Sequence, residues 1–212
     1  MRRVALIVAL LAAAPARADE RPDTDHLIWA GLGFALPTYF IGVVAHEGSH
    51  ALAAELAGAE VDELHLLPGV HHGHFYFGYV HTRGLASTGQ RVFFLVAPKL
   101  VDLAVLGSYG AVVLTDSAPD NHYASLGLAV LATGFWVDFS KDIPAFWEHS
   151  DVVKIYNLAG ATSELRRLPF RLLHLGLSAA AGTVIWIGYR DVFAEEDAAD
   201  SALLLPLAVG SF

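Results

Sequence analysis

The sequence predicts an all-α membrane protein with about four transmembrane helices and a small β-hairpin after the first core helix. Hydrophobic residues make up 55 % of the 212-residue chain and charged residues only 17 %, whereas soluble domains have about 25 % charged residues. The mean hydropathy is +0.48. Apolar stretches at 27–58, 92–114, 123–139 and 172–189 each have a length that can cross the hydrocarbon core of a bilayer.

The chain begins with the pattern of a secretory signal peptide. Two arginines precede an apolar stretch at 4–14, and the tripeptide at 16–18 matches a small-x-small cleavage site. We therefore expect residues 1–18 to be a cleaved signal peptide, with a short uncleaved anchor as the alternative. Both readings place the acidic segment that follows outside the cytoplasm. Residues 19–212 are expected to form a single polytopic domain.

The first long apolar stretch contains, near its end, a motif with the spacing of a metal site. His46 and His50 stand four residues apart, so a helix places both imidazoles on one face. This separation suits two nitrogen ligands of a tetrahedral Zn²⁺, and Glu47 can take a proton from a water molecule at the metal. The chain has no cysteine, so any metal must use His, Asp or Glu. The apolar run before His46 argues against two solvated histidines on a surface helix.

Residues 34–61 resemble the site-2 protease family of intramembrane zinc metalloproteases. An apolar helix reaches His46-Glu-Gly-Ser-His50 and continues as Ala-Leu-Ala-Ala-Glu-Leu-Ala-Gly-Ala-Glu-Val, and the resemblance is looser from there to about Asn157. The resemblance implies a zinc site inside the membrane, in a cavity that water can reach. It also implies a third ligand, an aspartate, from a later transmembrane helix.

The third ligand is expected just after the third apolar stretch. The family signature is Asn-x-x-Pro followed, after a few residues, by Asp-Gly. When Pro144 is matched to the signature, Lys141 replaces the Asn, Asp151 best matches the Asp, and Val152 replaces the Gly. The spacing from Pro to Asp is also longer than in most members. We expect Asp151 to be the third zinc ligand. The alternatives are Asp142, then Asp138 and His149.

Two short strands are expected between the first and second spans, at 60–67 and 73–81, with a turn at Pro68-Gly69. A free strand edge there can pair with an unwound substrate. The same segment contains His71, His72 and His74. A second metal site there is the weaker reading, and a loop in water or at the lipid headgroups is favoured.

Charged residues predict how the chain crosses the membrane. Lys99 and Asp102 stand three apart in the second span and can pair inside the bundle. Lys154 and three arginines at 166–171 gather between the third and fourth spans, so this loop is cytoplasmic by the positive-inside rule. The acidic loop at 115–122 then lies outside. We expect an integral protein of the bacterial inner membrane, with the N-terminus outside.

These observations lead us to expect an intramembrane zinc endopeptidase that hydrolyses peptide bonds of membrane-embedded substrates with metal-activated water. The expected partners are a transmembrane protein or peptide substrate, the lipid bilayer and an adaptor protein. The net charge of −9 argues against nucleic acid. The alternative is a catalytically inactive relative that binds membrane segments as a regulator or chaperone, because the Asn and Gly of the signature are missing. A third, weaker reading is a metal-handling protein that uses the loop at 71–81.

Overall fold

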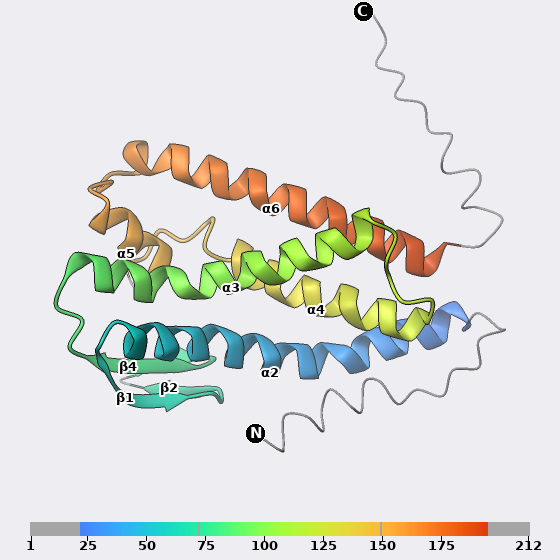
Figure 1. Cartoon of the computed structure of the whole chain (residues 1–212), viewed down its shortest axis with the longest axis horizontal. Coiled ribbons are helices and arrows are strands. Elements are labelled where there is room, and N and C mark those ends of the chain that lie inside the picture. The colour runs from blue at the N-terminus through green and yellow to red at the C-terminus, as the bar shows by residue number, and fades with distance from the viewer. Residues whose placement is uncertain (1–21, 72, 149, 195–212) are drawn as a thin grey trace, which may run out of the picture.

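Four long helices make up most of the structure, a computed structural model that describes residues 22–71, 73–148 and 150–194 (Figure 1). They are α2 (Thr24–Leu56), α3 (Thr88–Leu114), α4 (His122–Ser140) and α6 (Glu164–Phe193). Each is long and apolar enough to cross a membrane. The predicted helical class and its four candidate spans are therefore confirmed. The expected signal peptide at 1–18 lies outside the described residues.

The fourth helix begins at Glu164 rather than near 172. Its first turns carry Arg166, Arg167 and Arg171, so a search for apolar residues alone misses them. Two of these side chains are nevertheless buried, because they donate hydrogen bonds to backbone carbonyls and to Glu164. Polar partners therefore extend the helix beyond its apolar part.

Helix α4 packs against the other three long helices. The central cluster includes Ala129, Ala132 and Phe135 of α4, which are almost fully buried. Small side chains allow helices to approach closely. A Cβ at Gly134 would overlap the methyl group of Thr38 on α2, so this crossing requires glycine.

Large apolar side chains cover the outside of the bundle. Trp29, Leu36 and Trp186 are 70 %, 64 % and 63 % exposed. In water such a continuous apolar surface would be unfavourable, but in a bilayer the hydrocarbon chains cover it. The exposed faces therefore agree with the assignment of four candidate spans.

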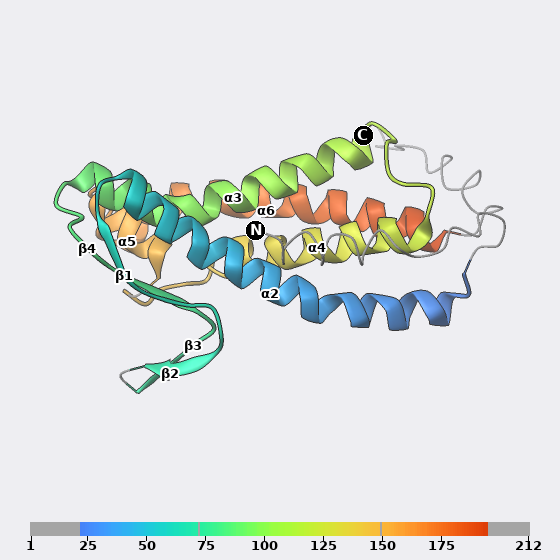
Figure 2. The same cartoon turned by 60° about the horizontal axis from the view of Figure 1, so that its bottom comes forward.

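A long bent β-ribbon follows α2 (Figure 2). Its strands are β1 (Glu60–His65), β2 (Gly69–His71), β3 (His74–Tyr76) and β4 (Tyr79–Arg83). Strand β1 pairs antiparallel with β4, and β2 with β3, which confirms the predicted hairpin. The turn predicted at Pro68-Gly69 is wrong, because the chain reverses between His71 and His74. Proline has no amide hydrogen, and Pro68 lies where the two ladders are interrupted rather than at the tip.

The ribbon, the end of α2, the start of α3 and the short helix α5 (Asp151–Leu158) gather at one end of the bundle (Figure 1). The start of α2, the α3–α4 loop and the end of α6 lie at the other. The Ser87 side chain caps α3, and the Ser87 amide in turn donates a hydrogen bond to Gln90 Oε1. The Gln90 amide group also donates to the Ala57 carbonyl at 2.7 Å. These contacts fix the start of α3 against the end of α2.

Candidate metal centre

Three of the predicted site residues meet at the crowded end of the bundle. His46 and His50 come from α2 and Asp151 from the first turn of α5. Their ligand atoms all lie within 4.8 Å of one another, and within the described ranges no other such group is found. Asp151 Oδ2 lies 3.1 Å from His50 Nε2 and 3.9 Å from His46 Nε2. Two ligands of one tetrahedral zinc are about 3.3 Å apart, so small adjustments fit these atoms to a metal.

The Phe94 carbonyl on α3 fixes the ring of His50. His50 Nδ1 donates to this oxygen at 2.8 Å. In a regular helix the Phe94 carbonyl would accept from the amide of residue 98, but Pro98 has no amide hydrogen. The proline therefore leaves the carbonyl available to the histidine. Because a carbonyl only accepts, Nδ1 carries a proton, and Nε2 is the ring nitrogen that faces Asp151.

Asp138 of α4 fixes the ring of His46. The Asp138 carboxylate accepts a hydrogen bond from His46 Nδ1 at 2.8 Å, and Lys141 pairs with its other oxygen. Such carboxylates behind a histidine orient it and raise its basicity toward a metal. Asp138, one of the alternative third ligands, therefore lies on the side of His46 that faces away from Asp151.

The carboxylate of Asp151 is shared between two neighbours. Lys154 contacts Oδ1 at 3.1 Å, and Oδ2 faces the histidines. Burial alone would raise the pKa of Asp151, but the hydrogen bond and charge of His50 and the charge of Lys154 outweigh it and hold the pKa below its usual range. Asp151 is therefore ionised near neutral pH, the form in which a carboxylate binds a metal.

Asp142, the first alternative third ligand, does not belong to the group formed by the two histidines and Asp151. Its carboxylate contacts Lys99 Nζ at 2.9 Å and accepts a hydrogen bond from Ser150 at 2.9 Å. Ser150 immediately precedes Asp151, so this contact helps to position it. His149, the last alternative, lies outside the described residues.

Lys99 lies at the centre of a buried ionic cluster between α3 and α4. Only 6 % of Lys99 is exposed, and its ammonium group contacts Asp102 at 3.4 Å, as the sequence predicted. It also contacts Asp142 and donates to the Asp138 backbone carbonyl at 2.6 Å. Buried charges are costly unless they are paired. The cluster therefore ties together the segments that carry Asp138 and Asp151.

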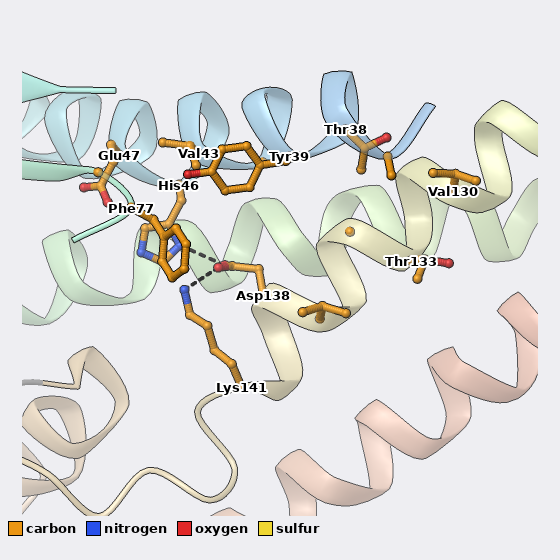
Figure 3. A pocket seen from close by; sticks show the side chains of 15 residues that line it. Thr38, Tyr39, Val43, His46, Glu47, Phe77, Val130, Thr133, Asp138 and Lys141 are labelled. Carbon is orange, nitrogen blue, oxygen red and sulfur yellow. Dashed lines mark hydrogen bonds and ion pairs between the residues drawn. The ribbon is translucent and has the colours of Figure 1, made fainter. Parts of the chain in front are cut away.

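A cavity of about 410 Å³ lies between α2, α4 and the ribbon (Figure 3). Its polar end is formed by His46, Glu47, Asp138 and Lys141, and the rest is mainly apolar. The Glu47 carboxylate accepts no hydrogen bond from any residue that the structure describes. A Cβ at Gly78 would lie 2.8 Å from Glu47 Cγ, so the ribbon packs directly against this side chain.

The second metal site considered on the ribbon depends on groups that the structure does not describe. These are His72 and the side chains of His71 and His74.

Sequence reasoning did not find the hydrogen-bond acceptors of the two metal-site histidines. A usable signal exists for one of them, because Pro98 marks the carbonyl four residues earlier as free. The contact between His46 and Asp138 joins residues 92 positions apart and has no local signal.

No protein-family model, curated protein or solved structure matches the chain.

Proposed function

We propose that this protein is an intramembrane zinc endopeptidase. The observation that carries the proposal is the convergence of His46, His50 and Asp151 beside Glu47. His46 and Glu47 line the polar end of a cavity between apolar helices, and the Glu47 carboxylate has no hydrogen-bond partner among the described residues. Two imidazoles and one carboxylate are a donor set found in catalytic zinc sites of hydrolases. A site with three protein ligands keeps a position open for water or substrate.

The chain's own residues supply the remaining parts of peptide hydrolysis. Zinc, when bound, polarises the substrate carbonyl and makes water acidic enough to react near neutral pH. Glu47 takes a proton from the attacking water as the new carbon–oxygen bond forms. It then gives this proton to the amine nitrogen as the carbon–nitrogen bond breaks. Asp138 and the Phe94 carbonyl keep the imidazoles of His46 and His50 in one orientation throughout.

The surroundings of the cavity favour a membrane-embedded substrate. The cavity lies between α2 and α4, two of the candidate spans, whose outer faces are apolar. A substrate helix must unwind locally, because its carbonyls are otherwise hydrogen-bonded. Helix α5, which carries Lys154, and the first turns of α6, which carry Arg166, Arg167 and Arg171, lie at the same end as the site (Figure 1). By the positive-inside rule, these charges support a site that faces the cytoplasm of a bacterial inner membrane.

Cleavage in proteoliposomes tests the proposal. The probe is a fluorescence-quenched single-span peptide with glycine and proline near its centre, which weaken its helix. Glu47→Gln should keep zinc and lose cleavage, while Glu55→Gln, an exposed glutamate on the same helix, should retain both. Unchanged cleavage in Glu47→Gln would refute the role of Glu47 as general base. A zinc-loaded parent that binds such peptides without cleaving them would favour the inactive, membrane-segment-binding alternative.

A further inference from the structure

Tyr39 carries an unpaired buried hydroxyl group. In the part of the chain that the structure describes, it is the one buried side-chain nitrogen or oxygen without a hydrogen-bond partner. Most buried polar groups in proteins are paired, because an unpaired one costs free energy. Other buried groups follow the rule, since Ser178 pairs with Ser140, and His174 donates to the Phe139 carbonyl. The exception at Tyr39 therefore calls for a reason.

The unpaired hydroxyl belongs to the cavity that borders the metal centre at His46. Tyr39 lies on α2 about two turns before His46 and Glu47, on the same face of the helix, and lines the cavity with them. Its ring packs edge-on against Phe40 and Phe77, with centroid distances of 5.3 and 5.9 Å. Figure 3 shows the hydroxyl directed along α2 toward the end of the cavity that contains His46 and Glu47.

Two other donors that line the cavity are already engaged. Lys141 pairs with Asp138, and Thr133 donates to the Ala129 carbonyl at 2.8 Å. The structure describes no partner for the Tyr39 hydroxyl, so its proton is available to a substrate. The aromatic contacts fix its direction before a substrate arrives.

We propose that Tyr39 is a catalytic residue that donates a hydrogen bond to the carbonyl oxygen of the scissile peptide as negative charge develops on it. The inference rests on the proposed endopeptidase function and adds the donor that this reaction needs. Tyr39 keeps its proton throughout, and only the length and strength of the hydrogen bond change. A donor held in place in a site of low dielectric stabilises such charge without reorganisation. The unpaired hydroxyl of the resting protein is thus paired by the substrate.

Tyr39→Phe tests the proposal, because it removes the hydroxyl and leaves the ring contacts. In proteoliposomes we expect kcat for the quenched peptide to fall about 10²-fold, the effect of losing one such donor, with KM changed less than about twofold. Zinc content should stay equal to the parent. The melting temperature should hold or rise by about 2–4 °C, because an unpaired buried hydroxyl is removed. Tyr123→Phe, which packs at the opposite end of the bundle, should change none of these.

Binding of a phosphinic peptide, a mimic of the tetrahedral intermediate, gives a readout independent of turnover. Tyr39→Phe should weaken this binding about as much as it lowers kcat. Equal kcat in parent and variant would overturn the inference. So would a rise in KM at unchanged kcat, which indicates ground-state anchoring, or a lowered melting temperature, which indicates a structural role. A parent that neither cleaves the peptide nor binds the phosphinic peptide would refute the proposed function itself.

Discussion

Replacing Asp138 with asparagine should weaken zinc binding while the fold is kept. Asparagine still offers an oxygen to His46 Nδ1, now 2.8 Å from the carboxylate, but it removes the negative charge that supports the imidazole. Loss of such a carboxylate behind a metal ligand costs about 10–100-fold in metal affinity, which corresponds to about 1.4–2.7 kcal/mol. The bundle should remain folded, because Lys99 keeps its contacts with Asp102 and Asp142.

The assay is competition for zinc between the metal-free protein in detergent and a chromophoric chelator, with thermal unfolding measured in parallel. Asp102→Asn is the matched control. Asp102 is 3 % exposed and shares the contact with Lys99, but the structure gives it no contact with His46. Its variant should bind zinc like the parent. Equal affinity in Asp138→Asn and the parent, or an equal loss in both variants, would refute the reasoning.

Two further variants test how α3 and the ribbon support the site. Pro98→Ala supplies an amide hydrogen that competes for the Phe94 carbonyl, so zinc affinity should fall about fivefold, the worth of one hydrogen bond, while thermal stability holds or rises. Pro37→Ala, the control, should leave zinc affinity unchanged. An equal fall in zinc affinity in Pro98→Ala and Pro37→Ala would contradict this explanation. Gly78→Ala places a methyl group against the proposed general base, so peptide turnover should fall about tenfold with zinc retained. Gly69→Ala is the control, because a Cβ at this position of the ribbon meets no other atom, and it should cleave the peptide normally. Normal turnover in Gly78→Ala would show that the contact between Gly78 and Glu47 is unimportant.

The long helices were predictable because a bilayer imposes one simple requirement, an apolar run of sufficient length. The hairpin followed from alternating residues. The tip of the hairpin was not predictable in this way. Pro68-Gly69 has the composition of a turn, but it lies at the break between the β1–β4 ladder and the β2–β3 ladder. The first turns of α6 were missed, since buried arginine hydrogen bonds stabilise them rather than an apolar run. Helix α5 was missed although it buries Val152, Val153 and Tyr156, because eight residues give an apolar face only about two turns to repeat.

Local spacing was enough to bring His46, Glu47 and His50 to one helix face, and the resemblance pointed to Asp151. The supporting contacts depend on tertiary structure. Asp138 reaches His46 from another helix, and the direction of the Tyr39 hydroxyl depends on how α2, α4 and the ribbon enclose the cavity. Spacing along one segment carries no information about such contacts.

Zinc per chain, measured in detergent-purified protein after zinc loading and removal of free metal, tests the central claim most directly. The comparison includes the parent, His46→Ala, Asp151→Ala and Asp142→Asn. Asp142 is the control position, because its carboxylate lies near the site but contacts Lys99 and not the histidines. We expect about one zinc per chain in the parent and in Asp142→Asn, and none held in the other two. A parent without zinc, or full zinc in Asp151→Ala, would contradict the three-residue metal centre.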